Sequence, residues 1–195
     1  PLLNKNIPIR IFNINKTDAK LTPLTIIERQ ENIRDEVIKS VTYSDDFCVI
    51  RLSGPGVGIK HGLVHKITSQ LEEERINIKL IFNTHTHINL FFSTFDIDRA
   101  YSIIKDIPLS GINRCIKKTG LSTVAVVGCG MMEKLGIAAR LFSAVAKEGV
   151  NIETINFGAS DVVTYFILDQ KDRNRAINAI HNEFFSKLIE QKETI

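Results

Sequence analysis

The segment VVGCGMMEKLGIAARLFSAVAKEGVNI (residues 126–152) decides the fold, because a diverged copy of it, LSGPGVGIKHGLVHKITSQLEEERINI, occupies residues 52–78. The two copies align without a gap at an offset of 74 residues, and extending the alignment over residues 50–99 gives 12 identities in 50 positions. Chance gives about one identity in twenty, whereas self-similarity at a fixed offset is typical of a repeat. The sequence therefore predicts an internal duplication.

Both copies show the same order of predicted elements, from apolar β-branched runs for strands and from helical spacing of apolar residues for helices. The expected strands of the two copies are 47–53 and 123–127, 77–82 and 151–156, and 87–93 and 162–168. The first helix buries Leu63, Ile67 and Leu71 in the first copy and Ile137, Leu141 and Val145 in the second. A second helix follows Asp98 in the first copy and Asp172 in the second. Each unit, closed by a fourth strand, predicts an α+β ferredoxin-like (βαββαβ) fold, an antiparallel sheet with helices on one face. A unit of about 70 residues is marginal alone, so we expect the copies to dock.

Composition limits the class of protein. The chain has 195 residues, 44% of them hydrophobic and 24% charged, with a formal net charge of +3 and no basic tract, so it does not indicate a nucleic-acid partner. No apolar run reaches the about 18 residues of a membrane span, and no secretory signal is present, so we expect no membrane partner. Cys48, Cys115 and Cys129 form no Cys-x-x-Cys pair, which favours a reduced, cytoplasmic setting. The chain begins with Pro1 and not Met, so we expect a fragment.

The Gly-x-Gly of each repeat first suggests a phosphate-binding loop, but the details exclude it. A dinucleotide fingerprint needs glycine at the sixth position, where the second copy has Glu133. A carboxylate there would repel a diphosphate, and no Gly-Lys-Ser/Thr follows as in a Walker loop. We therefore expect no nucleotide cofactor in this chain.

One carboxylate suits these loops better. The N–H groups at the start of the following helix attract an anion, and Gly62 and Gly136 at the helix entry would let a ligand approach the backbone. Asn77 and Asn151, expected to begin the neighbouring strand, offer both a donor and an acceptor. A zwitterionic amino acid fits this combination. The alternative is that the glycines only form the turn and the asparagines only cap the strand.

Two weaker patterns have structural explanations. His61, His65, His85 and His87 lie in one copy, but no cysteine or carboxylate is spaced with them as a metal ligand, so we expect no metal. Consecutive aromatic residues at 91 and 92 resemble those of RNA-binding sheets, yet a consecutive pair places one ring on each face. Core packing is the favoured interpretation.

Several motifs resemble aspartate kinases. Residues 126–185 are similar to their second ACT domain in the V-x-G-x-G-M loop, the G-I-A-x-R-x-F helix and the G-x-N-I strand start. Residues 47–107 look like the first ACT copy, and NIPIRIFNINKTDAKLTPLTII (6–27) is similar to the end of the kinase domain. This chain departs from the family pattern at two places. It has FGASDVV where the family has Q-G-A-S-E, and KLTPLTII where the family has G-T-L-I.

The resemblance implies a regulatory region that feeds back on an enzyme phosphorylating the aspartate side chain, the first step towards lysine, threonine and methionine. ATP and magnesium would belong to a kinase domain absent from this chain, so no catalytic residue is expected here. The first copy is inserted into the second in such kinases, so 37–43 would complete the second sheet. The domains expected are 1–32 (kinase-domain tail and linker), 47–118 (first ACT domain), and 33–46 plus 119–195 (second ACT domain). The alternative is a free-standing tandem-ACT sensor acting on another protein.

The resemblance also implies effector residues and homo-oligomers formed by ACT–ACT pairing. The effector residues are Val57, Lys60, His61, Gly62, Leu63, Val64, Asn77, Ile78, Thr84, His85, Asn151 and Ile152, with Gly130, Met131, Gly136 and Ile137 in the second-copy loop. Lysine-sensitive relatives place acids where this chain has Lys79 and His85. We therefore expect threonine or another neutral amino acid rather than lysine, and loss of binding stays an alternative.

Overall fold

The computed structural model describes residues 7–13, 23, 25–27 and 37–192, in two units, Pro1–Val37 and Ile38–Ile195. In the first unit, β1 (Ile9–Ile11) pairs antiparallel with β2 (Thr25–Ile27), and Ile9 lies opposite Ile27. The assignment of residues 1–32 to a kinase-domain tail falls largely outside the described residues and stays a prediction.

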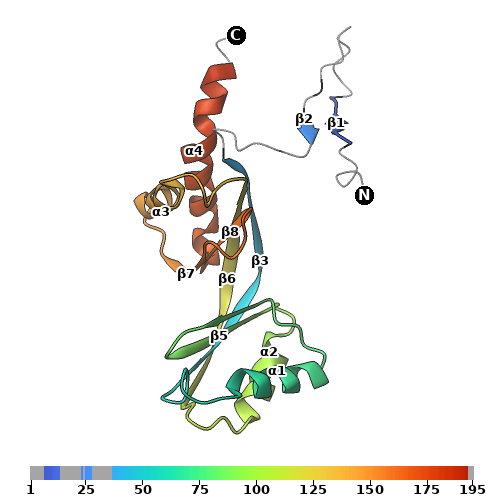
Figure 1. The fold of residues 1–195 in the computed structure, drawn as a ribbon, viewed down its shortest axis with the longest axis vertical. Helices are drawn as coiled ribbons and strands as arrows, with labels where there is room; N and C mark the ends of the chain where they lie inside the picture. Colours follow the sequence, from blue (N-terminus) through green and yellow to red (C-terminus); the bar gives the residue numbers. More distant parts are fainter. Residues whose placement is uncertain (1–6, 14–22, 24, 28–36, 193–195) are drawn as a thin grey trace. The chain divides into compact units, whose positions relative to one another are not determined.

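The second unit contains a six-stranded antiparallel sheet and four α-helices (Figure 1). In chain order, the elements are β3 (Ile38–Ser53), α1 (Leu63–Glu73), β4 (Leu80–Asn83), β5 (His87–Phe92), α2 (Ile97–Asp106), β6 (Arg114–Gly128), α3 (Ile137–Lys147), β7 (Ile152–Asn156), β8 (Val163–Asp169), a 3-10 turn η2 (Gln170–Asp172) and α4 (Arg173–Lys192). The strand order is β4-β5-β3-β6-β8-β7.

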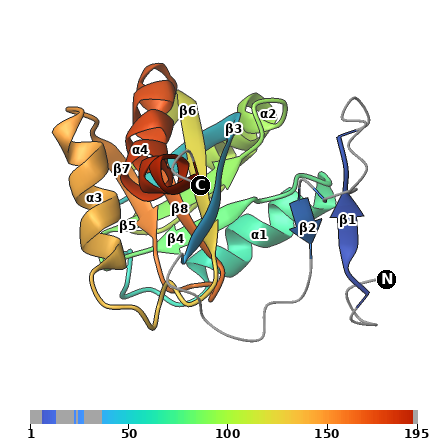
Figure 2. The same ribbon diagram turned by 90° about the horizontal axis from the view of Figure 1, so that it is seen from above.

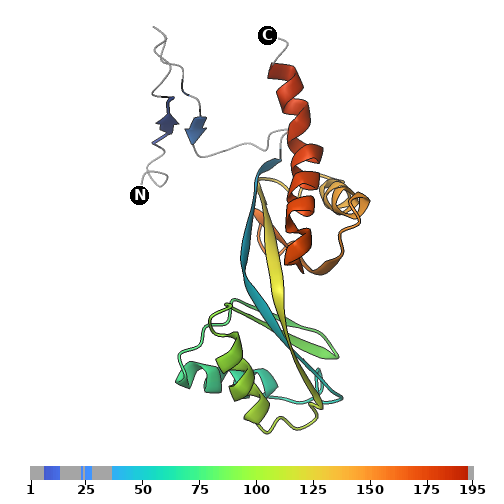
Figure 3. The ribbon, with the colours of Figure 1, turned by 180° about the vertical axis from the view of Figure 1, so that it is seen from behind.

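Two long strands are shared by both copies. The first copy has the strand order β4-β5-β3-β6 and contains residues 47–53 of β3 and 114–118 of β6. The second copy has the strand order β7-β8-β6-β3 and contains residues 121–128 of β6 and 38–44 of β3. Each set reads second-third-first-fourth strand, the ferredoxin-like order, so the predicted fold class is confirmed. The domain boundaries given from the sequence stay predictions. Figure 3 shows β3 and β6 running side by side from one copy to the other.

Helices cover one face of the sheet in each copy. In the first copy, alternate residues of β3 and β5 pack beneath α1 and α2, with Ile50, Leu90 and Ile67 fully buried. In the second, α3 and α4 lie beside one another (Figure 2), and Phe142 meets Phe166 of β8 edge-on at 5.5 Å between ring centroids. Of the consecutive aromatic pair, Phe92 joins the helix-side core and Phe91 the opposite face, which confirms the core-packing interpretation.

The duplication is visible in the backbone hydrogen bonds, which recur at the same offset of 74 residues. Lys60 N donates to Gly56 O at 2.9 Å, and Lys134 N donates to Gly130 O at 3.0 Å. At each helix start, Lys66 N donates to Gly62 O and Arg140 N to Gly136 O, both at 3.0 Å. A shared hydrogen-bond pattern at a constant offset confirms that the two loops are structural repeats.

Some predicted element bounds are wrong. The strand expected at 77–82 begins only at Leu80. After α1, Ile76 is buried, and Asn77 and Ile78 have irregular backbone. Asn77 therefore does not begin the strand. The helix expected after Asp98 already begins at Ile97, with Asp96 at its N-cap. The first strands were predicted as 47–53 and 123–127, whereas the structure has the longer β3 and β6, which also supply the fourth strands.

Candidate functional site

The first-copy loop runs from the end of β3 to the start of α1. Gly62 is the N-cap of α1 with φ 78° and ψ 3°, and Gly136 is the N-cap of α3 with φ 83° and ψ −4°. A Cβ at either glycine would meet no atom within 4 Å. The left-handed backbone conformation by itself requires glycine here, and the predicted approach of a ligand to this backbone stays a prediction.

This loop borders a pocket of about 410 Å³, and five of the predicted effector residues line it. The full lining is Gly58, Ile59, Lys60, His61, Gly62, Leu63, Val64, His65, Asn83 and Ile88. Val57 is buried beneath the loop instead. The sequence missed Asn83 and Ile88, which come from β4 and β5, because only the pairing of these strands brings them to the loop.

The 84–87 turn lies against the loop. A Cβ at Gly58 would meet the His85 backbone O at 2.9 Å and its Nδ1 at 3.2 Å. The turn is closed by Thr84, whose N–H donates to His87 O at 2.8 Å and whose hydroxyl donates to the same oxygen at 3.2 Å. Thr84 and His85 are therefore beside the loop, as predicted, but they do not line the pocket.

Asn77 and Ile78 are separated from that pocket. They border a different hollow together with Thr68, Glu72 and Arg75, at the C-terminal end of α1. The loop residues 60–62 precede α1 and Asn77–Ile78 follow it, and the 11 residues of the helix, at about 1.5 Å each, span roughly 16 Å. A single first copy does not bring all predicted effector residues together.

The second-copy loop has the same backbone but a different surface. Met131 and Ile137 are buried, Gly130 has φ 78°, Asn151 is exposed, and Ile152 is half-buried at the start of β7. Leu135, the counterpart of His61, is 97% exposed. At this one position the first loop presents a histidine and the second an exposed leucine.

The charge of the first-copy pocket comes from basic groups. Lys60 Nζ donates to Ser110 Oγ at 2.5 Å, His61 and His65 are exposed, and no carboxylate lines the pocket. Lys79, expected to face the effector, lies elsewhere. Its ammonium is held by Asp46, where β3 passes between the copies, so only the pocket residues disfavour a lysine effector.

Within the described residues, no group of three His, Cys, Asp or Glu side chains is placed to hold a metal ion. No described helix is long and apolar enough to cross a membrane.

Comparison with known proteins agrees with the fold. Residues 124–184 match the ACT domain family. The aspartokinase of Pseudomonas aeruginosa is 26% identical over 185 residues, 92% of this chain and 44% of that protein. The aspartate kinase of Clostridium acetobutylicum, described as an allosteric enzyme, matches with a TM-score of 0.81 and 26% identity, covering 94% of this chain and 42% of that one.

The regulatory subunit of aspartate kinase from Thermus flavus shares the fold, with a TM-score of 0.68 and 22% identity over 76% of this chain and 99% of that one. This chain covers 44% of the Pseudomonas protein, so it spans less than half the length of that relative. Residues 124–184 thus match the ACT domain family, and the chain as a whole is similar to the ACT regulatory region of aspartate kinases.

Proposed function

We propose that this chain is the amino-acid-sensing part of an aspartate kinase, where it exerts feedback control on the enzyme that phosphorylates aspartate with ATP. The observation that supports the proposal is the pocket at the first-copy loop, whose lining includes residues 60–64. ATP and magnesium are assigned to the kinase domain and not to this chain.

The pocket has suitable chemistry for the carboxylate of an amino acid. It lies at the start of α1, an 11-residue helix whose first N–H groups carry partial positive charge. Lys60 adds a full positive charge, and Asn83 adds an amide. With no carboxylate in the lining, the ammonium of a lysine side chain has no counter-charge, so threonine or another neutral amino acid is favoured.

The separation of the predicted residues supports a site shared between ACT domains. The loop pocket and the Asn77–Ile78 hollow lie at opposite ends of α1. A neighbouring ACT domain placed against the loop supplies the missing half. The exposed Leu135 and the edge strand β4, with its exposed Ile81 and Phe82, are surfaces for such pairing. The chain is therefore proposed to form homo-oligomers through ACT–ACT contacts.

Calorimetric titration of the purified chain with threonine, lysine, methionine and other amino acids tests the proposal. Binding of a neutral amino acid, with no detectable heat from lysine, is the expected result. Sedimentation in the presence and absence of the bound amino acid measures whether binding changes subunit association. If none of the amino acids binds, the sensing function is wrong and only an association role is left.

A further inference from the structure

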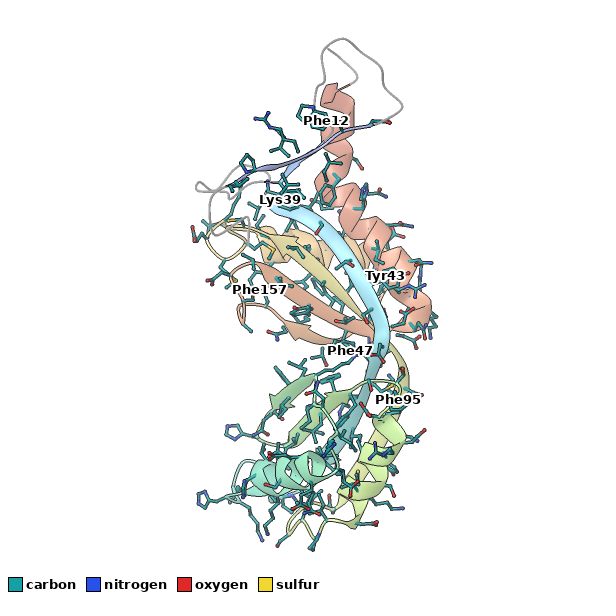
Figure 4. All side chains as sticks on the ribbon, turned by 90° about the vertical axis from the view of Figure 1, so that its right-hand side faces the viewer. Phe12, Lys39, Tyr43, Phe47, Phe95 and Phe157 are labelled. Atoms are coloured by element: carbon teal, nitrogen blue, oxygen red, sulfur yellow. The ribbon has the colours of Figure 1, made fainter. Side chains whose placement is uncertain are left out.

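Among the strands that the structure describes, only β3 and β6 pass between the copies, and their pairing is irregular at the crossing. Asp45 and Asp46 of β3 lie opposite the single residue Ser122 of β6, and Thr119 and Gly120 of β6 lie opposite Cys48. Each extra residue is a β-bulge, which interrupts the ladder and bends the strand. The crossing, residues 44–49 with 118–123, is here called the junction; Figure 4 shows Phe47 where β3 bends.

The two aspartates of the bulge bind opposite copies. Asp45 accepts a hydrogen bond from Arg173, the first residue of α4 in the second copy, and the Arg173 guanidinium also lies 4.3 Å from the Tyr43 ring. Asp46 accepts hydrogen bonds from first-copy residues, namely from Thr94 N at 2.7 Å, from Thr94 Oγ1 at 2.8 Å and from Lys79 Nζ at 2.5 Å. Adjacent residues of one bulge are thus fixed to the two copies by side chains.

Lys79 makes several contacts at the junction. Its Nζ also donates to the backbone oxygen of Asp46 at 2.5 Å and lies 4.9 Å from the Phe47 ring centroid. Its backbone N–H donates to Phe91 O at 2.8 Å. Phe91 belongs to a small apolar cluster with Val49, Leu121 and Ile167, which joins the sheet faces of both copies opposite the helices. Movement of Lys79 therefore acts on both the bulge and this cluster.

Lys79 also follows directly after Asn77 and Ile78, the proposed effector-contacting residues at the hollow beside α1. This segment is irregular backbone between α1 and β4, and Lys79 is its last residue before the strand. A ligand that orders or shifts the segment must displace the Lys79 backbone. The side chain transmits that displacement to Asp46.

We propose that the Asp46–Lys79 pair is a latch that couples effector binding at the first copy to the orientation of the second copy. Asp46 and Lys79 are positioning residues in this scheme and do not contact the ligand through their side chains. The proposal rests on the proposed function for its ligand, whereas the latch itself is testable without one.

The chain offers a matched control. Lys117 Nζ lies 2.5 Å from Asp98 and 5.4 Å from the Tyr101 ring centroid, so it makes the same kind of ion pair and ring contact as Lys79. That pair lies within the first copy, between β6 and α2, away from the β3 bulge. Lys79→Met and Lys117→Met therefore remove equivalent groups, and only the first removes a partner of a bulge aspartate, since Lys117 borders the junction in sequence but pairs with Asp98.

Hydrogen exchange measured by mass spectrometry tests the latch in two steps. Without ligand, Lys79→Met is expected to speed amide exchange in residues 44–49 and 118–121 at least threefold while leaving α1 and α3 unchanged, and Lys117→Met is expected to leave residues 44–47 of the β3 bulge at the wild-type rate. Equal junction exchange in wild type and Lys79→Met overturns the latch. Accelerated exchange throughout the chain also overturns it, because the role is then merely structural.

The second step adds the amino acid that binds most tightly. Wild type is expected to show changed exchange in both copies, and Lys79→Met only in the first. If Lys79→Met still passes the change to the second copy, the coupling is refuted. If no amino acid alters exchange anywhere in wild type, the proposed function and the coupling to it both fail, whereas the first step has already decided whether the pair holds the junction.

Discussion

Alanine in place of Gly62 or Gly136 tests whether the two repeat loops share one backbone conformation. Both glycines are helix N-caps with φ near +80° and ψ near 0°. A non-glycine residue in the left-handed region costs about 1–2 kcal/mol. The smaller conformational entropy of alanine in the unfolded chain returns about 0.4–1 kcal/mol. Because a Cβ meets no atom at either position, no steric term is added.

Each single substitution is therefore expected to lower the free energy of unfolding by about 1 kcal/mol. The two sites lie in different copies, so the double variant should lose about 2 kcal/mol by additivity. Urea denaturation followed by circular dichroism measures all three variants. Gly62→Asn should cost less than Gly62→Ala, because asparagine tolerates positive φ. An alanine variant as stable as wild type, or a clear difference between Gly62 and Gly136, would refute the shared conformation.

Three further predictions concern the core, the junction and association. Phe91→Ala should destabilise the chain by about 3–5 kcal/mol because Phe91 is 2% exposed, whereas Phe95→Ala, at a residue 84% exposed, should change unfolding by less than about 0.5 kcal/mol in the same urea assay. The Lys79 ammonium and the Thr94 N–H and hydroxyl lower the pKa of Asp46 to about 2, so its stabilisation is present above about pH 4 and is lost as the pH falls towards 2. Asp46 is half exposed, so solvent screening limits its contribution to about 1 kcal/mol. Urea titrations from pH 5 to pH 2 should show a smaller loss of stability in Asp46→Asn than in wild type; part of the loss is kept because the pKa values of Asp45 and Asp169 are also lowered. Leu135→Ser should weaken self-association about tenfold or more in sedimentation equilibrium, and wild-type chains that stay monomeric would contradict the pairing surface.

Much of the fold was predictable because duplication doubles the signal. One Gly-x-Gly turn is weak evidence, but two that align without a gap predict equivalent strands, turns and helices. Helix faces such as Leu63, Ile67 and Leu71 followed from spacing alone and are buried as expected.

The continuous strands could not be derived in the same way. Residues 38–44 pair with a segment about 80 residues later, and local sequence carries no record of such a partner. Their place in the second sheet came only from the resemblance to a known family. The bulge at Asp45 and Asp46 was likewise missed, because adjacent aspartates in a strand resemble a turn until their partners Arg173 and Lys79 are seen.

The site was predictable in part. The spacing around Gly62 located the loop, and residues 60–64 line one pocket. Asn77 was expected at the ligand because a strand was taken to begin there, and Lys79 because of the resemblance to lysine-sensitive relatives. The structure places the Lys79 ammonium on Asp46 instead. Side-chain direction in the short irregular segment after α1 depends on tertiary contacts that periodicity does not report.

The measurement that tests the central claim most directly is calorimetric titration of a neutral amino acid into wild type, His61→Asp and Asn178→Asp. Both substitutions replace an uncharged or weakly charged side chain by a carboxylate, but His61 lines the pocket and Asn178 lies exposed on α4. Repulsion between carboxylates several ångströms apart is worth about 1–2 kcal/mol near a protein surface. We predict binding to wild type and Asn178→Asp with equal affinity, and about tenfold or weaker binding to His61→Asp. No binding to wild type, or equal binding to all three proteins, would contradict the claim that the first-copy pocket is an amino-acid sensor.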